Sequence, residues 1–172
     1  MSKYYSINAV IDMNYKPLLY QTYDILFQEC PPEVSLGIFI SGCDHYCKGC
    51  HSQHLWNYEG ENLLDNLQSL LDLYKCYCTC VIFMGGDQNK KELIEAIKIC
   101  KNNNLKTCLY TGNNYLDPVL CIHLDYIKIG EFKEELGGLN KSSTNQRLYK
   151  INHFPSNKQK NYIQFEEIKL YQ

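Results

Sequence analysis

Short apolar runs alternate with amphipathic segments through the middle of this chain, and this alternation restricts its possible folds more than any other feature. The apolar runs have the length of buried strands, while the amphipathic segments repeat leucine and isoleucine at helical spacing. Such alternation predicts βαβ units, a mostly parallel sheet and therefore an α/β fold. We expect strands at 35–40, 79–84, 106–110 and 125–129, and helices at 63–74, 90–103 and around Pro118.

Both ends of the chain depart from this pattern. Residues 4–10 and 18–27 predict short strands or a hairpin around the turn-like sequence MNYKP. The segment after Gly130 is polar, and residues 131–172 are expected to form an irregular, extended tail. Because the 172 residues contain no repeat and no low-complexity linker, residues 1–172 are expected to form a single domain.

Each predicted parallel strand is followed by glycine. In α/β sheets and barrels, ligands bind at the carboxyl ends of the strands, and glycine there lets the backbone approach a ligand closely. Four such ends on one edge therefore indicate a binding site. The four stretches are Ser41-Gly42, Gly85-Gly86-Asp87, Thr111-Gly112 and Gly130.

Three cysteines lie on the loop after the first of these strands, in the sequence SGCDHYCKGCHS. Cys43, Cys47 and Cys50 are separated by three and then two residues, so one loop can wrap a single small centre. A structural zinc ion would need a fourth ligand, which His51, His54 or a distant cysteine could supply. A [4Fe–4S] cluster usually takes four thiolates, and with three it keeps one iron open for another ligand.

Simpler interpretations of the cysteines are also open. A zinc-binding interaction module fits the three thiols alone, and a dithiol of Cys47 and Cys50 leaves Cys43 without a role. The alternating Cys76, Cys78 and Cys80 are expected on one side of an extended segment. They are interpreted as buried or incidental thiols rather than a second metal site.

Charge and composition exclude several function classes. The formal net charge is -2, so no basic excess favours nucleic acid as a partner. No apolar run approaches the roughly 20 residues that span a bilayer, and the start lacks the apolar core of a signal peptide. A cytoplasmic protein without a membrane partner is therefore expected, with its ten cysteines reduced.

With these motifs in view, the chain resembles the radical S-adenosylmethionine enzymes. The resemblance rests on the spacing of Cys43, Cys47 and Cys50, on Gly85-Gly86-Asp87, and on Tyr110-Thr111-Gly112. It implies that the three cysteines ligate a [4Fe–4S] cluster whose fourth iron binds the amino and carboxylate groups of S-adenosylmethionine. It further implies contacts with that cofactor by Gly49, Cys50, His51, Gly85, Gly86, Asp87, Thr111 and Gly112, with Asp87 at the methionine amino group.

The order of motifs is similar to one family within this group, the anaerobic ribonucleoside-triphosphate reductase activating proteins. The matching stretches run from about residue 23 to 151, and SSTNQ at 142–146 is the most specific of them. Gly49, where the wider group has an aromatic residue, agrees with this family. The sequence FQECPPEVS at 27–35 replaces the usual Gly-Pro-Gly-x-Arg stretch and indicates a variant branch.

This resemblance implies an incomplete (β/α) barrel and a specific reaction. S-adenosylmethionine would be cleaved by one electron, and hydrogen would then be taken from a glycine of an anaerobic ribonucleotide reductase. A flavodoxin or ferredoxin is the expected electron donor. A radical enzyme that activates a different glycyl-radical protein, or that acts on a small molecule, is the alternative within the same group.

Overall fold

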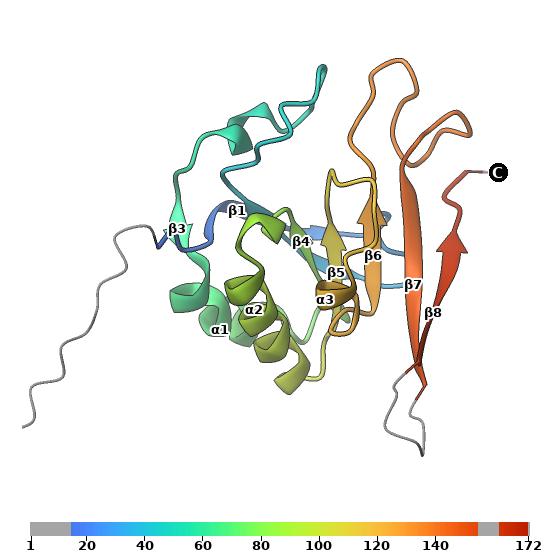
Figure 1. Cartoon of the computed structure of the whole chain (residues 1–172). Helices are drawn as coiled ribbons and strands as arrows, with labels where there is room; N and C mark the ends of the chain where they lie inside the picture. The colour runs from blue at the N-terminus through green and yellow to red at the C-terminus, as the bar shows by residue number, and fades with distance from the viewer. Residues whose placement is uncertain (1–14, 155–161, 172) are drawn as a thin grey trace, which may run out of the picture.

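The computed structural model describes residues 15–154 and 162–171, which build one eight-stranded sheet with its helices (Figure 1). The sheet has the strand order β3-β1-β2-β4-β5-β6-β7-β8. The strands are β1 (Leu19–Leu26), β2 (Ser35–Ile40), β3 (Glu61–Asn62), β4 (Cys80–Met84), β5 (Lys106–Tyr110), β6 (Tyr126–Ile129), β7 (Arg147–Phe154) and β8 (Tyr162–Ile168). The helices are α1 (Leu63–Tyr74), α2 (Lys90–Asn102) and α3 (Pro118–Cys121), with 3₁₀ turns η1 (Gln53–Trp56) and η2 (Asp87–Asn89).

The predicted strands and helices of the central part are confirmed to within a residue or two at their ends. Polar side chains fix where the helices begin. The Asn62 side chain accepts hydrogen bonds from two backbone amides at the start of α1, Asn89 does so from one at the start of α2, and Asp117 precedes the proline that opens α3. The predicted strand at 4–10 lies outside the described residues.

Parallel pairing is limited to the centre of the sheet. The pairs β2–β4, β4–β5 and β5–β6 are parallel, whereas the four pairs at the two sides are antiparallel. The expectation of a mostly parallel sheet therefore holds for the four central strands and not for the whole sheet. The reason is that β1 and β7 reach their neighbours without a helical crossover, which antiparallel strands permit. The incomplete (β/α) barrel stays a prediction.

The C-terminal segment is more regular than the expected irregular tail. Residues 147–154 and 162–168 form β7 and β8, paired antiparallel with each other and with β6. Their polar composition concealed the strands, because much of β8 and the end of β7 lie exposed and only Leu148 and Ile151 are fully buried. The stretch 131–146 contains neither helix nor strand, as expected.

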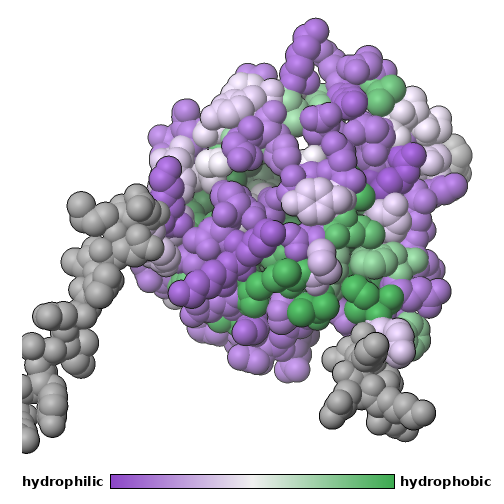
Figure 2. All heavy atoms as spheres, in the orientation of Figure 1, coloured by the Kyte–Doolittle hydropathy of each residue, from purple (hydrophilic) through white to green (hydrophobic). Residues whose placement is uncertain are grey.

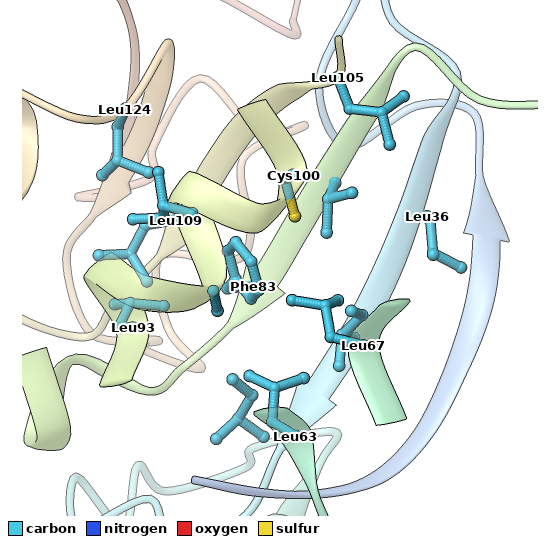
Figure 3. Close-up of a cluster of buried hydrophobic side chains, with 14 of the residues drawn as sticks. Leu36, Leu63, Leu67, Phe83, Leu93, Cys100, Leu105, Leu109 and Leu124 are labelled. Atoms are coloured by element: carbon cyan, nitrogen blue, oxygen red, sulfur yellow. The ribbon is translucent and has the colours of Figure 1, made fainter. Parts of the chain in front are cut away.

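The sheet has a different core on each face. All three helices pack on one face, against a large cluster of aliphatic side chains and Phe83 from β2, β4 and β5, part of which is drawn in Figure 3. The other face carries a smaller cluster that no helix residue joins, made of Cys30, Cys80, Ile82, Cys108, Tyr126 and Leu148. We call these the helix-covered face and the inner face.

The cysteines at 76–80 do not act together. Cys76 is exposed, Cys78 is buried in the helix-covered cluster, and Cys80 is buried in the inner-face cluster. The expectation that all three share one side of a strand is therefore wrong, because the chain turns between Cys76 and Cys80 before β4 begins. The interpretation of Cys78 and Cys80 as buried apolar thiols agrees with these positions.

The surface around this fold is mainly hydrophilic in the view of Figure 2, with hydrophobic side chains gathered near α3 and β7. Within residues 15–154 and 162–171, no helix has the length and apolar composition needed to cross a membrane.

Candidate functional site

A cavity of about 220 Å³ lies where the four central strands end, beneath the loop that follows β2. In Figure 1 the arrows of β4, β5 and β6 point toward this edge, and the loop 41–60 lies beside it. The strand ends meet there because parallel strands present their carboxyl ends at one edge of a sheet. The predicted site residues that line it are Cys43, Cys47, Cys50, Gly85, Gly86, Asp87, Thr111 and Gly112.

The cysteine loop is held at its start by backbone hydrogen bonds. The amide of Gly42 donates to the carbonyl of Asn57 at 3.3 Å, and that of Cys43 donates to the carbonyl of Leu55 at 3.0 Å. The amide of Cys50 donates to the carbonyl of Cys47 at 3.1 Å, which forms a tight turn between these two cysteines. The backbone therefore fixes the turn that presents Cys47 and Cys50 to the cavity.

Gly49 and His51 do not line this cavity. Gly49 has a φ of +73°, a left-handed backbone conformation that favours glycine, and it packs against the Glu134 side chain. The His51 ring lies 5.4 Å from the Phe132 ring and borders a second hollow. The expected cofactor contacts of these two residues therefore remain predictions.

The three thiols are half-buried, and burial raises the pKa of the Cys43 thiol. In the described residues, no three Cys, His, Asp or Glu side chains converge on one point that could hold a metal ion. The three thiolates of a [4Fe–4S] cluster each bind a different iron, so such a cluster does not need that convergence. What it needs is three thiols around one space, and all three line the same cavity.

The turn after β4 forms the opposite wall. Gly85 and Gly86 have φ values of +97° and +102°, which L side chains rarely adopt. Gln88 ties this turn to the end of β2: its carbonyl oxygen accepts from the Gly86 amide at 3.1 Å, and its amide nitrogen donates to the Ser41 carbonyl at 3.2 Å. The two strand ends are thereby fixed relative to each other.

Asp87 lies at the start of this wall with its carboxylate held from one side. The Thr111 hydroxyl donates to Oδ2 of Asp87 at 2.9 Å, and Nδ2 of Asn113 donates to the same oxygen at 2.6 Å. Asn113 did not emerge from the sequence, where it follows Thr111-Gly112 as an ordinary loop residue.

Gly112 connects the third strand end to the cysteine loop. A Cβ at this position would lie 2.5 Å from Cδ2 of His45, so the imidazole packs directly on the glycine backbone. His45 stands between Cys43 and Cys47 and lines the cavity as well. Any side chain at 112 would therefore displace the His45 ring.

Lys128 also lines the cavity, although it was not among the site residues predicted from the sequence. Lys128 is 7% exposed, and its Nζ donates hydrogen bonds to the carbonyls of Gly130 at 2.6 Å and Thr111 at 3.4 Å. Burial lowers the pKa of the ammonium to about 8, while the thiolates of the three cysteines oppose that shift. A lysine inside the apolar strand sequence YIKI was a visible signal, because charged side chains are rarely buried without a purpose.

The Trp56 side chain also lines the cavity. Its indole packs edge-on to Tyr46, with ring centroids 5.3 Å apart. The Nε1–H group is buried and has no acceptor among the described residues.

A second hollow of about 530 Å³ adjoins the first. It shares with the first cavity the side chains of Phe39, Cys50, Ser52, Met84, Tyr110, Phe132 and Gln146. Its other boundaries come from the 27–35 segment, through Gln28 and Glu29, and from Leu170 near the C-terminus. The site therefore extends from the cysteines along the inner face of the sheet.

Together these residues fit an iron–sulfur cluster with an amino-acid ligand. Three thiols, a carboxylate and a buried ammonium group border one space. Glycines at the ends of two strands, Gly85 and Gly86 after β4 and Gly112 after β5, keep side chains out of that space.

Comparison with known proteins agrees with this donor set. A family model described as a 4Fe-4S single cluster domain matches residues 33–149, which include the loop with all three cysteines and every strand end described above. A similar protein is the anaerobic ribonucleoside-triphosphate reductase-activating protein of Enterobacteria phage T4. It is 27% identical over 132 residues, which cover 69% of this chain and 85% of the phage protein. The predicted resemblance to these activating proteins is confirmed.

Proposed function

Since the chain belongs to the family of 4Fe-4S single cluster domains, we propose that Cys43, Cys47 and Cys50 are the ligands of its cluster. We further propose that the protein is a radical S-adenosylmethionine enzyme that generates a glycyl radical on an anaerobic ribonucleoside-triphosphate reductase. The relative from phage T4, an activating protein by name, supports this choice. One observation carries the proposal: three thiols, the Asp87 carboxylate and the Lys128 ammonium border a single cavity.

The cluster and its cofactor would supply the difficult chemistry. When bound, a [4Fe–4S] cluster with S-adenosylmethionine provides one-electron cleavage of the sulfonium and removal of hydrogen from a glycine Cα. The contribution of the protein is to bind, orient and shield these groups.

The charges around the cavity suit the methionine end of S-adenosylmethionine. We assign the ammonium group of the cofactor to Asp87 and its carboxylate to Lys128, because each has the opposite charge and is held in the cavity wall by hydrogen bonds. Asp44 also lines the cavity but is exposed. Lys128 also lies in the field of the three thiolates, which stabilise its protonated form. Burial strengthens these interactions, since water screens them poorly inside the protein.

The backbone and apolar walls complete the site. Gly85, Gly86 and Gly112 would allow close approach of the cofactor, while the Thr111 hydroxyl holds the Asp87 carboxylate at its amino-acid end. Phe39, Met84 and Tyr110 border both hollows and would exclude water from a reactive intermediate. The second hollow provides the route by which a loop of the reductase would reach the cavity.

Anaerobic purification followed by cluster reconstitution tests the proposal. We expect about four irons per chain, a brown colour and cleavage of S-adenosylmethionine by a strong chemical reductant. Incubation with a candidate reductase should then give the electron paramagnetic resonance spectrum of a glycyl radical. Reduced flavodoxin or ferredoxin should replace the chemical reductant.

The outcomes separate the competing functions. A colourless protein with one zinc ion per chain would show a zinc-binding module and refute the radical enzyme. Cofactor cleavage without a radical on any ribonucleotide reductase would favour activation of another glycyl-radical protein, or a small-molecule substrate.

A further inference from the structure

Asn113 connects three strand ends although it lies in none of the sequence motifs. Its backbone amide donates to the Thr111 hydroxyl at 3.0 Å, and its carbonyl accepts from the Gly130 amide at 2.7 Å. Its side-chain Nδ2 donates to Oδ2 of Asp87 at 2.6 Å. The residue is thereby fixed on β5 and β6 while its side chain reaches the turn after β4.

Both donors that reach Asp87 bind the same carboxylate oxygen. Thr111 and Asn113 donate to Oδ2, and no side chain or backbone amide in the described part of the chain donates to Oδ1. Two hydrogen bonds to one oxygen fix the rotation of the carboxylate and leave the other oxygen as a free acceptor.

Among residues 15–154 and 162–171, the Asp87 carboxylate forms no salt bridge with a lysine, arginine or histidine. Both donors are neutral, so they hold the carboxylate without cancelling its charge. The lysine nearest in sequence, Lys90, is engaged elsewhere, with Nζ 2.5 Å from Oδ2 of Asp117. A carboxylate that is oriented, charged and unpaired, in the wall of a cavity, favours a cationic ligand group.

We propose that Asn113 is a positioning residue that, together with Thr111, presents Oδ1 of Asp87 to the ammonium group of the cofactor. This inference rests on the proposed function, because it takes the ligand to carry an α-amino group. It assigns Asn113 an effect on the amino-acid end of the ligand and none on the nucleoside end.

Two ligands that differ in the amino-acid end test this assignment. S-adenosylhomocysteine carries the α-amino and carboxylate groups, whereas 5′-methylthioadenosine lacks both. Equilibrium binding of each is measured under anaerobic conditions on cluster-loaded protein. In Asn113→Ala, affinity for S-adenosylhomocysteine should fall about tenfold, the effect of losing one hydrogen bond to a charged group. Affinity for 5′-methylthioadenosine should stay within twofold of wild type.

A neighbouring asparagine provides the matched control. Asn114 is exposed, and no side-chain hydrogen bond of it appears among the described residues, so Asn114→Ala should bind both ligands like the wild type. Asn113→Asp keeps the shape of the side chain but replaces the donor with a second carboxylate. It should therefore weaken S-adenosylhomocysteine binding more than Asn113→Ala, and the loss should shrink at lower pH.

Iron content and the thermal unfolding midpoint show whether each variant is folded and loaded. If Asn113→Ala does not load, Asn113→Asp supplies the comparison. Equal loss of both ligands, or no loss of either, would overturn the positioning role while leaving the proposed function intact. Wild-type protein that binds neither ligand would overturn the proposed function and this inference with it.

Discussion

The two faces of the central sheet are built from the same strands but have different roles. The helix-covered face buries leucine, isoleucine and phenylalanine against α1, α2 and α3 (Figure 3). The inner face buries cysteines, tyrosine and a lysine, and it leads to the candidate site. Because side chains of a strand alternate between faces, one short sequence such as Cys80–Met84 contributes to both. The difference suggests that stability resides mainly on one face and chemistry on the other.

The largest effect is expected for a cluster ligand at the edge of the sheet where the inner face leads into the cavity. Cys47→Ala removes one of three thiols and should abolish the cluster, with iron content falling from about four per chain to near zero. The variant should stay folded, because Cys47 is only half-buried and belongs to neither core cluster. Iron analysis and circular dichroism of the anaerobically purified variant are the measurements.

Cys76→Ala is the control for this change, since Cys76 is an exposed cysteine outside the site. It should keep the iron content of the wild type. A Cys47→Ala protein that retains its cluster and cleaves S-adenosylmethionine would refute the ligand assignment.

On the helix-covered face, the expected effect is on stability. Leu67 on α1 is fully buried, and Leu67→Ala should lower the free energy of unfolding by about 2–5 kcal/mol through lost burial and a residual cavity. Leu73 lies on the same helix but is 65% exposed, so Leu73→Ala should change it by less than about 0.5 kcal/mol. Urea unfolding of the metal-free proteins measures both. Similar losses in the two variants would contradict the division between faces.

The helix-covered face was the more predictable of the two. Leu63, Leu67 and Leu71 recur at helical spacing and identify the buried side of α1, since the hydrophobic effect acts on every apolar side chain alike. The cysteine spacing and the motifs at the strand ends likewise identified eight of the residues that line the cavity. These signals are local, because each lies within a few residues of sequence.

What sequence reasoning missed depends on contacts between distant segments. The side chain of Asn113 donates a hydrogen bond to Asp87, which is 26 positions away in the sequence. Lys128 lies among residues of the loops that follow β2 and β5. The hairpin β7–β8 was missed for a related reason. Residues of β7 and β8 pack against the helix-covered cluster and the inner-face cluster, and these contacts form only when the sheet is folded.

Lys128 offers a smaller effect that depends on pH. In the metal-free protein the pKa of this lysine is about 8, below its ordinary value of 10.5, because the ammonium is buried. Between these values the unfolded chain binds a proton that the folded protein has released, so folding stability should rise with pH. Lys128→Met should lack this contribution. The measurement is the difference in unfolding free energy between wild type and variant from pH 7 to 10.5.

That difference should move in favour of the wild type as pH rises through 8, and cysteine and tyrosine titrations common to both proteins cancel from it. A constant difference over this range would show that Lys128 is not desolvated on the inner face. Loading the cluster should move the rise to higher pH, since bound thiolates near Lys128 favour its charged form.

The smallest effect is expected where the two faces meet. Gly86 adopts a φ of +102°, and a Cβ there would lie 2.9 Å from Cδ1 of Ile40, which belongs to the helix-covered cluster. Gly86→Ala should therefore cost about 1–2 kcal/mol of unfolding free energy, the usual penalty for a left-handed L residue. Because Gly86 also lines the cavity, the same change should weaken S-adenosylmethionine binding while the iron content stays unchanged. A loss of stability with unaltered binding would show that Gly86 supports the fold and does not contribute to cofactor binding. The binding residues of this turn would then begin at Asp87.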